Sequence, residues 1–182
     1  VVINKVGNID DFNDVYLPMI RKMNIPLLGV IPVMPELTYV SAGYLADRIF
    51  AKVLAGESGL NHQVRNLVVG SMGAKSAMKS PLFQDHHQVV IISGDRRDLI
   101  LTSLESQVAA IIISNNIVPS SIIISKAENL GIPLLLVATD THETAKQIDG
   151  IEPLPTYEDM DKIIMIEKMV KDHVDLRVFT PL

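Results

Sequence analysis

Three apolar runs in the second half of the chain each end in a cluster of small or charged polar residues. The runs cover residues 89–92, 109–113 and 133–137. Short apolar runs bounded by turn residues are typical of strands buried on both faces, and these predict a parallel sheet. Because ligands gather outside the carboxyl ends of parallel strands, the polar clusters mark a candidate site. The clusters are, in chain order, Ser93-Gly94-Asp95-Arg96, Ser114-Asn115-Asn116 and Thr139-Asp140-Thr141.

The segments after these runs have the periodicity and the terminal residues of helices. One helix is expected over 120–129, with Gly131 after its end. Asp140 begins a capping-box pattern for a helix that runs to Ile148, and an amphipathic helix is expected over 157–173. Strands that alternate with helices at this spacing predict an α/β fold with a mostly parallel sheet.

The first part of the chain contains fewer elements. Residues 1–6 and 27–31 predict strands, and the stripe over 12–23 predicts a helix that Asp10 and Asp11 can cap. A second helix is expected from residue 40 to Gly56, and a boundary at 57–59. Two strands are too few for a stable sheet of their own. They must extend a sheet supplied by missing sequence, by the second region or by another subunit.

Composition narrows the class of protein. The 182 residues are 48% hydrophobic and 20% charged, which favours a packed globular chain. A net charge of -5 without a basic run argues against nucleic acid as a partner, and the chain contains no Cys. No apolar stretch reaches the roughly 18 residues that a membrane span needs. We expect a soluble, cytoplasmic protein, and the start inside an apolar run suggests a fragment of a longer one.

Four charged residues follow the first apolar run. Asp95 is well placed to cap the next helix, and Asp98 lies where an acid favours the helix dipole. Arg96 and Arg97 oppose that dipole by about 0.3–1 kcal/mol each. Either they pair with the two aspartates or an anion occupies the helix end. The anion would belong to a ligand or to another subunit, and we favour the structural or interface role.

Other motifs carry weaker signals. Gly70-Ser71-Met72-Gly73 follows a predicted strand at 67–69 and precedes a short predicted helix near 74–78, but its spacing departs from a P-loop. It predicts a tight turn, with a weak anion site as the alternative. Ser114-Asn115-Asn116 predicts a turn whose amides could also bind a ligand or partner. Asp140 and Thr141 could form a metal or phospho-acceptor site, but we favour the role of Asp140 as the cap of the following helix.

We expect no catalytic site and no metal in this chain. The five histidines are scattered, none in a His-x-x-x-His pair, and no sequence pattern pairs a nucleophile with a base.

Residues from about 60 to 150 resemble the DRTGG domain family. The matching features are Val68-Val69-Gly70-Ser71-Met72, Ser93-Gly94-Asp95-Arg96-x-Asp98, Gly131-Ile132-Pro133 and Asp140-Thr141. The Thr-Gly-Gly signature of the family would follow Ile113, where this chain has Ser114-Asn115-Asn116. This departure affects any ligand contact that needs bare glycine backbone at the turn.

The first region is similar to the C-terminal part of dethiobiotin synthetase-like P-loop domains. The likeness rests on residues 2–6, 28–37 and 53–56. In that family an upstream P-loop holds ATP and an asparagine after a late strand helps to hold adenine. The resemblance implies that Asn4, with Lys5, is the remnant of the adenine side. Since the P-loop is absent here, the ATP site cannot be complete.

Together these resemblances imply three segments: 1–57 from the P-loop domain, 58–153 as the DRTGG domain, and 154–182 as a C-terminal helix and tail. The same order is found in the N-terminal region of long phosphotransacetylases and in free-standing relatives. It implies a three-layer α/β/α fold like the N-terminal domain of HPr kinase. It also implies a regulatory module that forms homodimers and has no cofactor, with a nucleotide or an anionic metabolite as the ligand it would sense. The alternative is a fragment of an ATP-dependent or phosphotransacetylase-family enzyme whose P-loop lies upstream.

Overall fold

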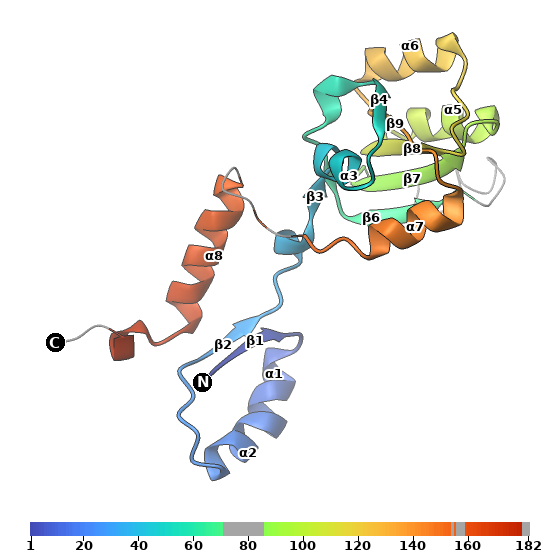
Figure 1. The fold of residues 1–182 in the computed structure, drawn as a ribbon. Helices are drawn as coiled ribbons and strands as arrows, with labels where there is room; N and C mark the ends of the chain where they lie inside the picture. Colours follow the sequence, from blue (N-terminus) through green and yellow to red (C-terminus); the bar gives the residue numbers. More distant parts are fainter. Residues whose placement is uncertain (71–85, 154, 156–158, 180–182) are drawn as a thin grey trace. The chain divides into compact units, whose positions relative to one another are not determined.

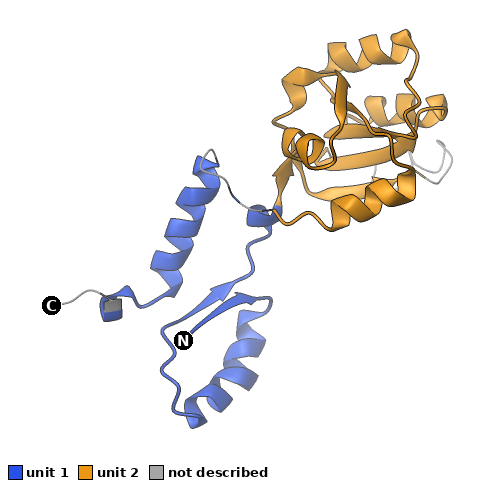
Figure 2. Ribbon diagram, in the orientation of Figure 1, with its two compact units in different colours: residues 1–38, 154–182 blue, residues 39–153 orange. Residues whose placement is uncertain are grey.

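The computed structural model describes residues 1–70, 86–153, 155 and 159–179. The chain forms two compact units (Figures 1 and 2). One unit, Tyr39–Pro153, is continuous, and the other combines Val1–Thr38 with Leu154–Leu182. The Tyr44 hydroxyl donates a hydrogen bond to the carbonyl of Glu152 at 3.1 Å, which ties the beginning of the continuous unit to its end.

A five-stranded sheet forms the centre of the unit 39–153 (Figure 1). Its strand order is β4-β9-β8-β7-β6, in which β6 to β9 are parallel and β4 runs antiparallel at one edge. The prediction of a mixed α/β fold with a mostly parallel sheet is therefore confirmed. The strands are β4 (Lys52–Ala55), β6 (Asn66–Val69), β7 (Gln88–Ser93), β8 (Ala110–Ser114) and β9 (Leu134–Leu136).

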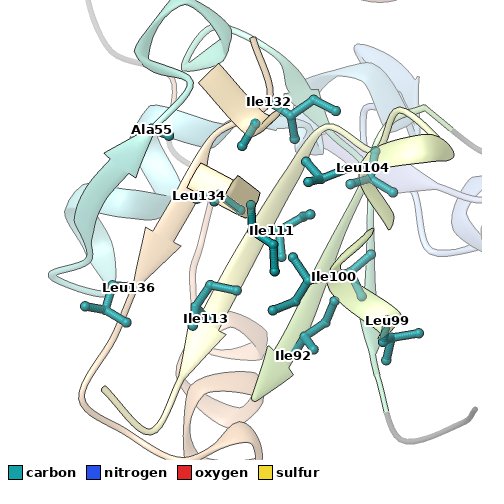
Figure 3. Packing of buried hydrophobic residues seen from close by; sticks show 14 of the residues in the cluster. Ala55, Ile92, Leu99, Ile100, Leu104, Ile111, Ile113, Ile132, Leu134 and Leu136 are labelled. Carbon is teal, nitrogen blue, oxygen red and sulfur yellow. The ribbon is translucent and has the colours of Figure 1, made fainter. Parts of the chain in front are cut away.

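Helices cover both faces of this sheet, which explains the continuous apolar runs. Val90 and Ile92 of β7 face the cluster that contains helices α5 and α6 (Figure 3), whereas Val89 and Ile91 face the cluster that contains α3 and α7. Successive residues of a strand point to opposite faces, so every position of the run has to be apolar. The helices are α3 (Ala42–Arg48), α5 (Arg97–Glu105), α6 (Ser121–Leu130) and α7 (Thr141–Asp149).

The predicted helix from residue 40 to Gly56 is wrong in its second half. Helix α3 ends at Arg48, and Phe50 adopts a left-handed φ of 52° that no helix continues. The next residues form β4, in which Val53 pairs with Leu135. The apolar spacing from Val40 to Leu54 therefore combined a helix with a strand. Two short strands that the sequence did not predict, β3 (Val40–Ser41) and β5 (Gln63–Val64), pair antiparallel.

The unit boundary also differs from the one expected at 57–59. The continuous unit begins at Tyr39, because Ala42, Leu45 and Ile49 of α3 belong to the core against the sheet. Residues 154–182, expected as a separate tail, group instead with 1–38.

The second unit contains a parallel strand pair with a helical connection. Strands β1 (Val2–Val6) and β2 (Gly29–Pro32) pair, and the connection comprises α1 (Ile9–Asp11), a π-helix (Phe12–Tyr16) and α2 (Leu17–Lys22). The N-cap is Asn8, whose side chain accepts from the Asp11 amide at 3.1 Å, so the expected capping by Asp10 and Asp11 is wrong.

Helix α8 (Met160–His173) belongs to the same unit, and Val174 bridges to Gly29 of β2. The predicted start of this helix at Tyr157 lies outside the described residues. Beyond the helix, a hydrogen bond from Arg177 lowers the pKa of the Asp175 carboxyl. The remaining short elements are the 3-10 helices Pro35–Thr38, Glu57–Gly59 and Leu176–Phe179. In the part of the chain that the structure describes, no helix has the length and apolar character needed to cross a bilayer.

Phe50 provides a test of backbone strain. The residue is 92% exposed and its φ is 52°, a conformation that glycine adopts without the penalty of about 1–2 kcal/mol that other L-residues carry. Phe50→Gly is therefore expected to raise the free energy of unfolding by about 0.5–1 kcal/mol, measured by urea denaturation. Lys52→Gly, at an exposed strand position without positive φ, is the matched control and should lower it. A loss of stability in both variants would contradict the strain at Phe50.

Candidate functional site at the carboxyl ends of the parallel strands

The carboxyl ends of β7, β8 and β9 lie at one edge of the sheet, as the sequence predicted. Ser93 and Ser114 are register partners at the ends of β7 and β8. The turn that follows β8 contacts the segment that follows β9, because the Asn115 amide donates to the Thr139 carbonyl at 2.9 Å. All three polar clusters found in the sequence therefore meet at this edge.

A chain of side-chain hydrogen bonds runs along the edge. The Asn115 side-chain amide donates to the hydroxyl oxygens of Ser93 at 3.1 Å and Ser114 at 3.4 Å. The Ser114 hydroxyl, on a fully buried residue, lies 2.8 Å from the Thr141 hydroxyl. The structure thus brings together Ser114, Asn115 and Thr141 of the predicted set.

The turn after β8 consists of two consecutive left-handed residues. Asn115 has a φ of 65° and Asn116 a φ of 55°. Asparagine tolerates this region better than other residues with a side chain. The Asn116 amide also donates to the Val137 carbonyl at 2.9 Å. The left-handed turn is therefore built here on two asparagines, one of whose side chains crosses to β7.

Gly94 contacts the backbone of the connection from β8 to α6. A Cβ atom at this position would clash with the backbone carbonyl of Ile117. The absence of a side chain at Gly94 lets the connection lie across the end of β7. Next along the chain, Ile117, Val118 and Ile122 are exposed by 40%, 56% and 76%. The edge therefore combines a polar network with an exposed apolar surface, which we call the 117–122 patch.

The charged cluster before α5 differs from the prediction. The N-cap position is occupied by Arg96, whose side chain makes no capping hydrogen bond, so the expected capping by Asp95 is wrong. Asp98 lies in the first turn as expected, and its carboxylate is 3.6 Å from Arg96 Nε. Both side chains are at least one-third exposed, so this pair contributes at most about 1 kcal/mol. Asp95 and Arg97 are exposed beside them.

Asp140 has the capping role that the sequence predicted. Its carboxylate accepts from the Glu143 amide at 2.8 Å at the start of α7. The hydroxyls of Thr139 and buried Thr144 lie 2.8 Å apart beneath it. Sequence reasoning placed Ser93 and Thr139 in the polar clusters at the strand ends but did not include Thr144. The signal for Thr144 was a hydroxyl one turn into the helix that follows a buried strand.

The remaining predicted residues lie elsewhere. Asn4 and Lys5 belong to the other unit, where the Asn4 side chain accepts from the Lys5 amide at 2.8 Å. Gly70 directly follows β6, and its amide donates to the Ile91 carbonyl at 2.8 Å, whereas residues 71–73 of the predicted weak anion site lie outside the described residues. Within the described ranges, no group of three or more His, Asp or Glu residues could hold a metal ion.

Comparison with known proteins identifies one family and two kinds of relative. A family model described as the DRTGG domain matches residues 44–151. The phosphate acetyltransferase of Pseudomonas putida is 25% identical over 189 residues, covering 96% of this chain and 27% of that protein. The phosphate acetyltransferase of a Synechocystis species is 27% identical over 146 residues, covering 75% of this chain and 21% of that protein. The chain thus spans about a quarter of the length of these relatives.

A solved structure shares the fold. It contains the CBS and DRTGG domains of the regulatory region of Clostridium perfringens pyrophosphatase, complexed with the activator diadenosine tetraphosphate. The TM-score is 0.52 at 16% sequence identity, over 85% of this chain and 74% of that one.

The close contact between Gly94 and the Ile117 carbonyl can be tested by substitution. Gly94→Ala is expected to lower the free energy of unfolding by about 1–3 kcal/mol, because the new methyl group would displace the Ile117 carbonyl. Gly150→Ala, whose Cβ would lie 3.5 Å from the Gln147 carbonyl oxygen, is the control and should be close to neutral. Equal stability of both variants in urea denaturation would show that the connection does not depend on Gly94.

Proposed function

Because the chain belongs to the DRTGG domain family, we propose that it is a regulatory and oligomerisation module without an active site of its own. Its DRTGG region would have the three-layer α/β/α fold that the family resemblance implies. The proposal is supported by the make-up of the carboxyl edge. There the hydrogen bonds between side chains join hydroxyls and one amide, which bond and orient but do not form an acid and base pair, and a charged contact is the partly exposed pair of Arg96 and Asp98.

The 117–122 patch is the observation that carries the assembly role. Three exposed aliphatic side chains lie on and just after the connection that crosses Gly94, and Asp95, Arg96 and Arg97 follow that glycine directly. Interface cores combine apolar side chains with arginine and are poor in lysine. A two-fold axis at this edge would place the acidic and basic groups of one copy near the opposite groups of the other. We therefore propose a homodimer through the carboxyl edge.

The same edge is our proposed sensor site for a nucleotide or an anionic metabolite. The N-cap residue of helix α5 makes no capping bond with its side chain, so the first amide groups of the helix and the exposed Arg97 guanidinium, beside Arg96, are suited to an anion. The related pyrophosphatase region was solved with diadenosine tetraphosphate. That likeness concerns the fold alone, and the ligand of this chain remains part of the proposal.

The relatives favour a second candidate function. The phosphate acetyltransferase of Pseudomonas putida aligns with nearly the whole chain, so the chain would act as the regulatory part of an acetyl-transfer enzyme. The β1–helix–β2 unit would then derive from a dethiobiotin synthetase-like P-loop domain, for which its parallel strand pair is the support. Phosphate-dependent release of coenzyme A from acetyl-coenzyme A by the isolated chain would contradict the non-catalytic role.

Assembly can be tested by sedimentation velocity over a range of protein concentrations. The full chain should sediment as a dimer that dissociates on dilution. Ile122→Glu and Arg96→Ala should shift it towards the monomer, because the first places a charge in the 117–122 patch and the second removes a guanidinium beside it. Lys52→Ala, an exposed cation on β4, is the control. Identical sedimentation of all four proteins, with unchanged far-UV circular dichroism, would exclude this interface.

Ligand binding can be tested by thermal denaturation with ATP, AMP, diadenosine tetraphosphate, acetyl phosphate, coenzyme A and NADH. One of them should raise the melting temperature in a saturable way, since a ligand at 100 times its Kd stabilises by about 2.7 kcal/mol. Arg97→Ala should remove most of that shift, and Lys146→Ala on α7 should keep it. If no compound has any effect on the wild-type chain, the sensor role is wrong, and the dimer proposal is unaffected.

A further inference from the structure

A hollow of about 360 Å³ opens at the amino ends of the parallel strands, at the edge opposite the candidate site. His86 and His87 come directly before β7, Gln107 lies in the connection that leads to β8, and Ile132 lies two residues before β9. His62 enters from the segment before β5. Three of the five histidines in the chain therefore line a single hollow.

Backbone carbonyls hold two of these imidazole rings in one tautomer. His62 Nδ1 lies 3.2 Å from the Ala109 carbonyl, and His86 Nδ1 lies 3.2 Å from the Gln107 carbonyl. A carbonyl oxygen can only accept, so Nδ1 of each ring must carry a proton. Nε2 is then a lone-pair acceptor in the neutral ring, and any further proton must bind there.

Contacts with Gly59 and Ala42 fix the position of the His62 ring. A Cβ on Gly59 would lie 2.7 Å from His62 Cε1, so the ring packs against a residue that has no side chain. The His62 amide donates to the Gly59 carbonyl at 2.9 Å, and the His62 carbonyl accepts from Ala42 at 2.9 Å. On the facing loop, Gln107 adopts a left-handed φ of 52°, from which its carbonyl contacts His86.

The described residues that line the hollow include no carboxylate. Among the charged side chains that the structure describes near the hollow, Glu57 is exposed. Glu105 pairs with Lys126 at 2.9 Å, Glu128 accepts from the Gly56 amide at 2.6 Å, and the Arg65 guanidinium stacks on the Tyr39 ring at 4.6 Å. The described residues of the wall therefore offer no carboxylate to balance positive charge on the His62 and His86 rings.

We propose that this hollow binds a small organic carboxylate with an apolar body, and that it does so when its imidazoles are protonated. Protonation converts Nε2 of His62 and of His86 from an acceptor into a charged donor, which is the partner a carboxylate requires. The amides of Gln63 and Gln107 add neutral donors, and Val108 and Ile132 supply an aliphatic wall. The three histidines are not assigned to a metal, since no group of three or more such described side chains could hold one.

Benzoate is a suitable probe, and NMR signals of the histidine side chains are the readout. On the full chain at pH 5.5, benzoate should shift the signals of His62, His86 and His87 in a saturable way. The affinity should fall by about tenfold or more at pH 8, because a neutral imidazole with its proton on Nδ1 offers a carboxylate no Nε2 donor. His142, exposed on α7, should not respond. Inorganic phosphate, which has no apolar body, should bind more weakly than benzoate.

Substitution provides the second arm of the test. His86→Gln should weaken benzoate binding at pH 5.5 by about tenfold, because a charged hydrogen bond is replaced by a neutral one. His142→Gln should leave the affinity unchanged. Arg96→Ala should also leave it unchanged, which separates this hollow from the proposed sensor site. Three outcomes on the wild-type chain would each overturn the proposal. They are the absence of saturable shifts at pH 5.5, tighter benzoate binding at pH 8, and equal shifts of the His142 signal.

Discussion

Burial of β7, β8 and β9 on both faces is the constraint on which the rest of the structure depends. Residues 89–92 and 110–113 are fully or almost fully inaccessible to water, so their side chains must be apolar. Parallel neighbours need a crossover between them, and α5 and α6 supply these while covering one face. Polar chemistry is thereby excluded from the length of the strands and confined to their two ends. Both sites argued above lie at those ends for this reason.

At the carboxyl edge, backbone conformation and side-chain chemistry meet in Asn115. Its left-handed backbone turns the chain after β8, and its amide side chain bonds to the hydroxyls of Ser93 and Ser114. A glycine would allow the same turn but would supply no such bonds. The edge is therefore more tightly linked than one built on glycine. A rigid edge of this kind is suited to an interface that must be preformed before a partner binds.

The sequence predicted the buried strands well, because a run that is apolar at every position has few other structures open to it. It also predicted the cap at Asp140 and the left-handed end of α6 at Gly131, since both depend on local residue types. It failed where a tertiary contact decided the outcome. Val53 and Leu54 fit a helical stripe, but pairing with β9, more than 80 residues later, makes them a strand. Asp95 had the right chemistry for a cap, yet the turn after β7 places Arg96 at that position.

The hydrogen bond between Tyr44 and Glu152 shows that the two ends of the unit 39–153 lie close together. It brings together the two points at which the chain enters and leaves the unit 39–153, while residues on either side of that unit, Gly29 and Val174, bridge to each other. In the order of the chain, the unit 39–153 is thus inserted between two segments, 1–38 and 154–182, that form the other unit. A unit with adjacent ends can be gained, lost or exchanged by a single genetic insertion without breaking the host fold.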